Sequence, residues 1–389
     1  MRKLIKIGLD GGQGTLKCAA SYLYESDSIF ETSEPASKRR KFSEGLNVEK
    51  LSNNNGVNRV QILSLSTDSE ENYEKLKFML GKLNLEPGSF LLCADLKVIN
   101  ISLGLQTHSA RHPCPYCHWT KGKLSTDDVL RTFEGIKAQY DSWMQGTGGD
   151  RAKLKNFFNC QDVPLSIFPL TGMVLDHVPL SELHIMMGVT NKLVDELIKV
   201  NIPQLEKMRN VRLFQVWPEA ANWPRRLHLL REDYHQGFEG NQCRQLLKKV
   251  AKLEELVNED CQKHPEKDYE THPAKVFIDA LTALDKVVGG CFGKNLCCDY
   301  KERIRIFSSS YDKCNISITS KVHAIKAHLE YFLDKHQTGL ALFSEQAFEA
   351  IHSRFMKTWA KYKIKDKTNP NFFKALLLAV LDFNGANII

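Results

Sequence analysis

The first hundred residues alternate short apolar runs with polar turns, and each run has the length of a single strand or helix. Strands are predicted at residues 3–9, 19–23, 60–65 and 90–94, and helices at residues 70–83 and 97–105. The run at 90–94 is apolar throughout, which is typical of a strand buried on both faces. The resulting order of strand, strand, strand, helix, strand, helix predicts an α/β fold built on a mixed sheet.

The rest of the chain changes character twice. Residues 25–58 are polar and predict a long loop, which contains the basic run Lys38–Lys41. Helical periodicity then dominates at residues 129–140, 181–198, 243–257, 272–287, 344–359 and 371–383. We therefore expect a first core segment at 1–118, a mainly helical insertion at 119–340, and C-terminal helices at 341–389 that complete the core.

Composition narrows the functional classes only slightly. The 389 residues are 42% hydrophobic and carry a net charge of +7, which is compatible with a nucleic-acid partner without requiring one. The 11 cysteines are irregularly spaced, and the N-terminus does not resemble a signal peptide, which favours a reducing compartment over a disulfide framework. No apolar run reaches the length of about 20 residues that a membrane span needs.

Two aspartates stand at the ends of predicted strands. Asp10 precedes Gly11, Gly12 and Gly14, and this pattern suits a metal-binding carboxylate, a phosphate-binding loop or a plain hairpin turn. Asp95 ends the strand at 90–94 and could be a metal ligand or a helix cap. A matched pair is the more informative observation, because divalent ions in phosphoryl-transfer sites need several hard oxygen ligands.

The pair Cys114 and Cys117 has the two-residue spacing that lets two thiolates bind one tetrahedral ion. His323 and His328, with four residues between them, could supply the other two ligands and so tie the insertion to the core. A redox pair of cysteines is the alternative. Other candidate ligands, which we interpret as ordinary surface or core residues, are His112, His118, Cys291, Cys297 and Cys298.

Two further motifs have both a functional and an ordinary interpretation. Glu345 and Glu349 share one face of a predicted helix, as ligands or as a solvated acidic face. The helix that follows Gly240 presents groups suited to bind phosphates, although a basic exposed helix would look the same. Its candidate DNA-binding residues are Asn241, Arg244, Lys248 and Lys249.

Taken in chain order, these blocks resemble the recombination-activating transposase family, which includes Transib transposons and the catalytic subunit of the V(D)J recombinase. The matching blocks are Asp10-Gly, Ala94-Asp95, Cys114-x-x-Cys117, Val178-Pro-Leu-Ser-Glu-Leu-His184-Ile-Met-Met-Gly188, Gly240-Asn241-x-x-Arg244-x-Leu, His323-x4-His328 and Ser344-Glu345-x-Ala-x-Glu349. The resemblance runs through nearly the whole chain but is dilute between these blocks.

The resemblance implies an RNase H-like core with a zinc-containing helical insertion, the zinc bound by Cys114, Cys117, His323 and His328. It implies a DDE triad of Asp10, Asp95 and Glu349 holding two Mg²⁺ or Mn²⁺ ions, with Glu345 as the alternative third carboxylate. The expected activity is DNA nicking followed by strand transfer that forms a hairpin. A homodimer, an accessory subunit and a nuclear location would accompany that activity.

This sequence departs from the family's pattern, so we consider further functions besides an active transposase. The family's DNA-end-binding domain, which precedes the first aspartate, has no counterpart here, and Gln245 stands where the family often has Lys. We therefore expect a truncated or domesticated copy, or a catalytically inactive DNA-binding derivative. The segment Ile7–Lys17 also resembles the first phosphate loop of sugar kinases and acetate kinase-like ATPases, although a convincing second phosphate loop is missing.

Overall fold

A computed structural model of the chain describes residues 3–12, 15–24, 60–67, 70–107, 109–123, 129–200, 238–263, 268–362, 364 and 366–386. These residues form two compact units, one made of Met1–Ser181 with Leu342–Ile389 and the other of Glu182–Ala341. The first unit thus continues past residue 118, where the sequence suggested that the insertion starts. The expected loop at 25–58 and the basic run Lys38–Lys41 lie outside the described residues.

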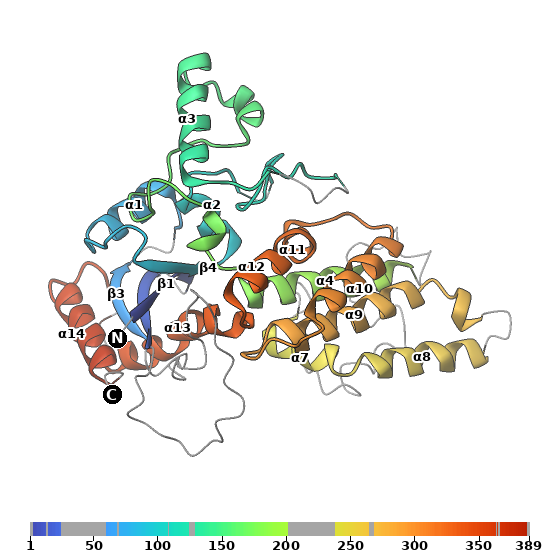
Figure 1. Cartoon of the computed structure of the whole chain (residues 1–389). Coiled ribbons are helices and arrows are strands. Elements are labelled where there is room, and N and C mark those ends of the chain that lie inside the picture. Colours follow the sequence, from blue (N-terminus) through green and yellow to red (C-terminus); the bar gives the residue numbers. More distant parts are fainter. Residues whose placement is uncertain are drawn as a thin grey trace, which may run out of the picture. The chain divides into compact units, whose positions relative to one another are not determined.

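A four-stranded mixed sheet forms the centre of the first unit. Its strands are β1 (Lys3–Gly12), β2 (Thr15–Tyr24), β3 (Gln61–Ser66) and β4 (Phe90–Ala94), in the order β3-β2-β1-β4 (Figure 1). β1 pairs antiparallel with β2 from Lys3↔Tyr24 to Gly12↔Thr15, and β2 pairs antiparallel with β3. β4 pairs parallel with β1, from Ile5↔Phe90 to Leu9↔Ala94. The expected mixed α/β sheet and the buried character of β4 are confirmed.

The strand containing Asp10 is longer than predicted. β1 continues for two residues beyond Asp10, and Gly11 and Gly12 pair with Leu16 and Thr15 of β2. The predicted strand of residues 3–9 was therefore too short at its end, because backbone pairing with β2 offsets the low strand propensity of glycine. Asp10 nevertheless lies beyond the β1–β4 ladder, which ends at Leu9↔Ala94.

Helices cover both faces of this sheet. α1 (Tyr73–Gly81) and α2 (Leu96–Ser102) lie on one side, and α13 (Gln346–Trp359) and α14 (Phe372–Gly385) lie on the other (Figure 1). α3 (Phe133–Thr147) also belongs to this unit. Gly8 of β1 fits directly under α13: a Cβ atom built there would lie 2.1 Å from Phe348 Cγ. Only a glycine lets helix and strand approach this closely.

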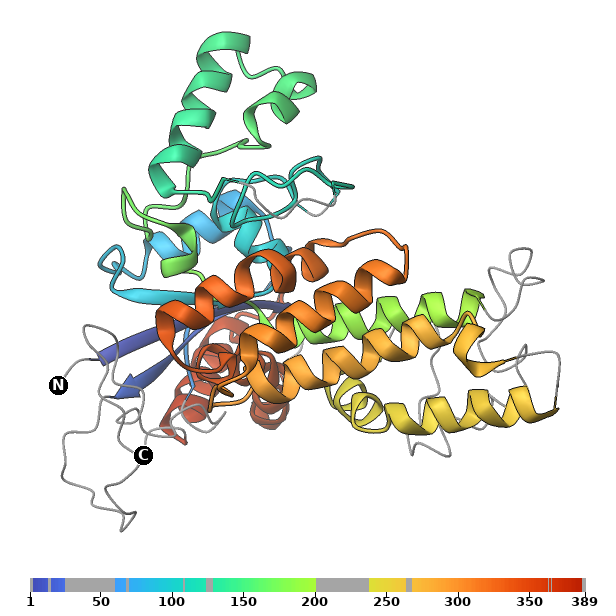
Figure 2. The same ribbon diagram turned by 45° about the vertical axis from the view of Figure 1, so that its right-hand side comes forward.

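The second unit is helical among its described residues. Its elements are α4 (Glu182–Val200), α7 (Gly240–Leu247), α8 (Val250–Lys263), α9 (Lys275–Cys291), α10 (Tyr300–Lys313), α11 (Ser320–His323), a π-helical turn (Ala324–His328) and α12 (Leu329–His336). α4, α9 and α10 pack side by side around an apolar core (Figure 2). Among the described residues no helix has both the length and the apolar character to cross a membrane.

Candidate metal centres

The Cys114–Cys117 loop buries both thiols and gives each a backbone donor. Cys114 is 1% exposed and Cys117 is fully buried. The N–H of Tyr116 donates to Cys114 Sγ at 3.4 Å, and the N–H of Trp119 donates to Cys117 Sγ at 3.3 Å. Burial raises the pKa of Cys114, but hydrogen bonds from Cys117 and nearby backbone and the charge of Arg131 outweigh it, so the pKa lies below its usual value. The loop therefore favours thiolate, the form that binds metals.

Arg131 donates hydrogen bonds to the backbone of this loop, and the sequence did not indicate this role. Its side chain is 2% exposed, and Nε donates to the carbonyl oxygens of Cys114 at 3.1 Å and Cys117 at 3.0 Å. Nη2 donates to the carbonyl oxygen of Phe158 at 2.9 Å, and Nη1 lies 3.6 Å from Cys160 Sγ. A buried cation beside two thiols offsets the charge of the thiolates. A single arginine in a loop carries no sequence pattern that would have revealed this role.

A π-helical turn explains how His323 and His328 can act together. Two residues five apart on an α-helix point about 140° away from each other. Here Ala324–His328 forms a π-helix, whose i→i+5 hydrogen bonding brings such residues onto one side. The two imidazole rings are consequently 5.0 Å apart between centroids, and both histidines are 1% exposed.

Cys114, Cys117, His323 and His328 together form one buried group, called here the Cys/His cluster. One ligand atom from each residue lies within 4.8 Å of the others. Ligand atoms around a tetrahedral zinc are separated by roughly 3.5–4 Å, given Zn–S near 2.3 Å and Zn–N near 2.0 Å. Two thiolates and two imidazoles are also the donors that zinc favours. The residues predicted from spacing are thus brought together, and the group could hold a metal such as zinc.

The other candidate metal ligands have partners outside the cluster. His118 stacks on Phe158 with ring centroids 3.8 Å apart, and His112 Nδ1 lies 3.1 Å from the carbonyl oxygen of His118. Burial lowers the pKa of His118 to about 4, with the charge of Arg131 acting in the same direction. Within the described parts of the chain, neither these histidines nor Cys291, Cys297 and Cys298 join the cluster.

Asp10 and Asp95 are neighbours at one edge of the sheet. The β1–β4 ladder ends at Leu9↔Ala94. Asp10, still within β1, and Asp95, the residue after β4, therefore directly follow the last paired residues of two adjacent parallel strands. Both are half-buried. Asp95 Oδ1 also accepts from the N–H of Val98 at 2.7 Å and so caps α2. The helix-cap interpretation of Asp95 is therefore correct. The cap uses one carboxylate oxygen, and the second oxygen could still bind a metal ion.

Two lysines and a third acid surround this edge. Lys17 is the cross-strand neighbour of Asp10, and burial lowers its pKa to about 8, against the effect of the Asp10 charge. Lys97 lies 2.7 Å from Glu71, and Glu71 Oε1 accepts from the N–H of Gly11 at 3.1 Å. The hydrogen bond with Glu71 raises the pKa of Lys97, and the Asp95 charge adds to it. Glu71, which the sequence did not single out, thus links β1 to the start of α2.

The structure places Glu345 and Glu349 in different surroundings. Glu345 is 3% exposed and accepts a hydrogen bond from Ser181 Oγ at 2.6 Å. Its charge also raises the pKa of the buried Lys6, which burial lowers overall. Glu349 lies one turn further along α13 and is half-buried. Lys6, Gly8 and Asp10 alternate onto the face of β1 that α13 covers, since Phe348 contacts Gly8 and its ring lies 5.9 Å from Lys6 Nζ.

The four candidate DNA-binding residues lie on α7 and directly after it. Arg244 Nη2 is 3.1 Å from Oε1 of Glu182, which is 1% exposed. The pair joins α7 to α4. The two helices also approach closely at Gly240, where an added Cβ atom would lie 2.5 Å from Leu183 Cδ1. Arg244 therefore has a packing role within the second unit. Asn241 and Lys248 are exposed, and Lys249 is half-buried.

Comparison with known proteins identifies one short match. A family described as a domain of unknown function (DUF8703) matches residues 42–131. The matched segment contains β3, α1, β4, α2, both cysteines of the cluster and Arg131. A search of curated proteins found no match.

Proposed function

We propose that this protein is a DDE-type DNA transposase or endonuclease-like protein with an RNase H-like core, which nicks a phosphodiester and then transfers the strand to form a hairpin. The observation that carries the proposal is the register of β1 with β4, in which Asp10 of β1 comes next to Asp95, the residue that directly follows β4. α13, which carries Glu349, covers one face of β1. Because Glu349 lies on the helix that covers the face onto which Asp10 alternates, we infer that it serves as the third carboxylate.

The carboxylate edge, defined as Asp10, Asp95 and Glu349, would hold two Mg²⁺ or Mn²⁺ ions through hard oxygen ligands. When bound, such ions activate an attacking water or 3′-hydroxyl and stabilise charge on the phosphodiester. The chain itself positions the ligands. Pairing with Lys17 of β2 holds the backbone of Asp10, and the N–H of Val98 donates to one Asp95 oxygen. Lys17 and Lys97 offset part of the negative charge before ions bind.

Zinc in the Cys/His cluster would have a structural role in this proposal, because all four ligands are buried. Closed sites of four protein ligands leave no open position for a substrate. DNA is the expected partner. A homodimer, an accessory subunit and nuclear location through Lys38–Lys41 complete the proposal, as expectations of the family resemblance.

The test is a nicking assay on an oligonucleotide duplex with Mn²⁺ or Mg²⁺, comparing the wild type with Glu349→Gln and its matched control Glu345→Gln. We expect Glu349→Gln to lose at least a hundredfold in nicking rate, whereas Glu345→Gln should lose stability through its buried contact with Ser181. Equal nicking by Glu349→Gln and the wild type would remove Glu349 from the triad.

The same preparation separates the alternatives. ATP hydrolysis that depends on Asp10 but not on Glu349 would favour the kinase-like function. DNA binding with no nicking under any divalent ion, in a folded protein, would favour the inactive derivative.

A further inference from the structure

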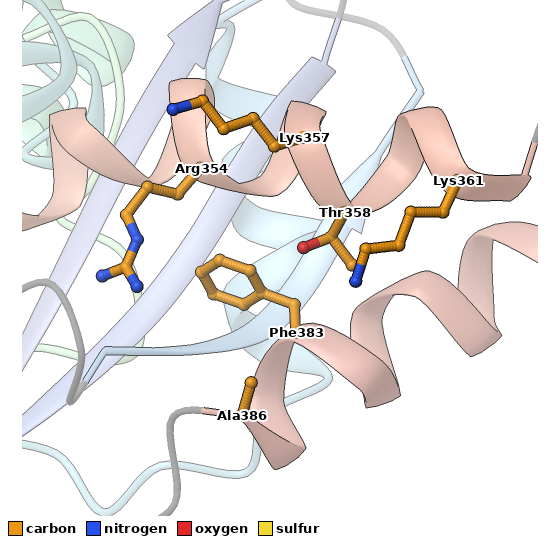
Figure 3. Close-up of a pocket in the computed structure, with 6 residues that line it drawn as sticks. All are labelled: Arg354, Lys357, Thr358, Lys361, Phe383 and Ala386. Carbon is orange, nitrogen blue, oxygen red and sulfur yellow. The ribbon is translucent and has the colours of Figure 1, made fainter.

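A basic pocket lies between α13 and α14 in the first unit (Figure 3). Its volume is about 280 Å³, and its lining residues are Arg354, Lys357, Thr358, Lys361, Phe383 and Ala386. Drug-sized ligands generally occupy cavities of about 300–1,000 Å³, so this pocket suits a small group or a part of a larger molecule.

The lining has the chemistry of an anion site. Among the described lining residues there are three cations, one hydroxyl and no carboxylate. Arg354, Lys357 and Lys361 follow one another at spacings of three and four, which places them along one side of α13 and its 3-10 extension Ala360–Tyr362. Lys361 approaches Asp382 at 3.7 Å, but both side chains are largely exposed, so water screens that pair.

The floor of the pocket is aromatic and rigid. Phe383 is 4% exposed and packs edge-on against Phe355, with ring centroids 5.9 Å apart. Figure 3 shows Arg354 and Lys361 on either side of the Phe383 ring, with the Thr358 hydroxyl directed toward it. The packed Phe383 ring thus gives the pocket an apolar floor between two cations that are suited to bind phosphate.

The position of the pocket relates it to the carboxylate edge. Arg354 on α13 and Lys361 on its 3-10 extension follow Glu349 by five and twelve residues, or about 8 and 18 Å along the helix axis. The ring centroid of Phe355, the residue after Arg354, lies 5.6 Å from Lys17 Nζ, and Lys17 is the cross-strand neighbour of Asp10.

We propose that this pocket binds backbone phosphates of the nucleic-acid strand whose bond is held at the carboxylate edge. The inference rests on the proposed function for its substrate. It adds a site that positions the strand through charge and one hydroxyl, without reading its sequence.

The test measures binding of a labelled single-stranded oligonucleotide by fluorescence anisotropy at several salt concentrations, without added divalent ions or chelator. The variants are Arg354→Ala, Lys361→Ala and Thr358→Val, and the matched control is Lys374→Ala, an exposed lysine on α14 outside the pocket. Each lost phosphate contact should reduce the slope of log K against log salt by about 0.7. Thr358→Val should weaken binding with an unchanged slope.

Pocket variants that bind with the same affinity and slope as Lys374→Ala would overturn the proposal. Lys361 is largely exposed, so its substitution should leave the fold intact and keep the test decisive. Tighter binding of ATP or inorganic phosphate than of the oligonucleotide, lost in the same variants, would also overturn the assignment to nucleic acid.

The outcomes also separate this inference from the proposed function. If the protein does not nick but its pocket variants bind DNA with reduced salt dependence, the pocket proposal stands and the transposase proposal fails. If the protein nicks but its pocket variants show unchanged salt slopes, the proposed activity stands and the pocket proposal fails.

Discussion

The Cys/His cluster and the carboxylate edge differ in burial and in how closely their members approach. One ligand atom from each cluster residue lies within 4.8 Å of the others, whereas among the described residues no group of three carboxylates is gathered in this way. All four cluster residues are buried, with backbone N–H groups on the sulfurs and Arg131 behind them. Asp10, Asp95 and Glu349 are half-buried. A closed set of soft ligands suits a permanent structural ion, whereas an open set of hard ligands suits ions that exchange with substrate.

The difference also concerns charge. In the cluster a buried cation and N–H donors stabilise thiolates, which favours metal binding. At the carboxylate edge Lys17 and Lys97 offset the carboxylates themselves. Without an ion, the edge is thus partly neutralised. Under the proposed function, we therefore expect loss of the cluster metal to destabilise the protein, and loss of ions from the carboxylate edge to reduce mainly activity.

The largest expected effect on stability follows from loss of the cluster metal. Cys117→Ser, or a strong chelator, should lower the melting temperature markedly and cost several kcal/mol, because the binding free energy of a structural zinc contributes directly to folding. Metal content by mass spectrometry and thermal denaturation are the measurements. Cys314→Ser, at a buried cysteine outside the cluster, is the control and should keep its metal. An unchanged melting temperature after complete metal removal would exclude a structural role.

A smaller effect is expected from overpacking beneath the carboxylate edge. Gly8→Ala should destabilise the protein by about 1–3 kcal/mol, because the new methyl group would collide with Phe348 and push α13 away. Urea denaturation measures this cost. Gly81→Ala is the control: nothing lies within 4 Å of its added Cβ at the end of α1. If both variants were equally stable, the close packing of α13 on β1 would be wrong.

Substitution of Asp95 separates its two roles. Asparagine caps helices about as well as aspartate, so Asp95→Asn should keep the wild-type stability while losing metal-dependent nicking. Asp95→Ala should lose both, at a stability cost of about 1 kcal/mol. Nicking rates and urea denaturation of the two variants make the comparison. Wild-type nicking by Asp95→Asn would leave the cap as the function of this residue.

A further effect is expected in the pH dependence of stability, through Lys17. Its pKa in the folded protein is about 8, below the ordinary value of 10.5, because burial disfavours the charged form. The unfolded chain therefore binds more protons between these values, so this lysine makes the protein more stable as pH rises from about 8 to 10.5. Lys17→Met should remove that rise. The measurement is the difference between wild-type and variant stability at several pH values, which cancels the contribution of buried cysteines such as Cys18. A difference that does not change with pH would contradict the burial of a titrating Lys17.

Much of the fold could be predicted from local sequence because the relevant patterns are local. Apolar runs gave β3, β4 and most helices to within a few residues, and the spacings of Cys114 with Cys117 and of His323 with His328 identified the cluster. The helices at Tyr300–Lys313 and Leu329–His336 were missed. Their many charged residues lower their average hydrophobicity, although their apolar residues recur with clear helical periodicity.

Tertiary structure decided what depends on contacts between distant residues. The π-turn that aligns the two histidines, the buried Arg131 behind the cysteines, and Glu71 beside Lys97 leave no pattern along the chain. The same holds for the different surroundings of Glu345 and Glu349, which are equivalent in sequence but not in burial. Residue type and spacing determine which ligands and elements are available, because these depend on neighbours along the chain. Burial, pKa and the pocket between α13 and α14 depend on packing partners, which only the folded structure supplies.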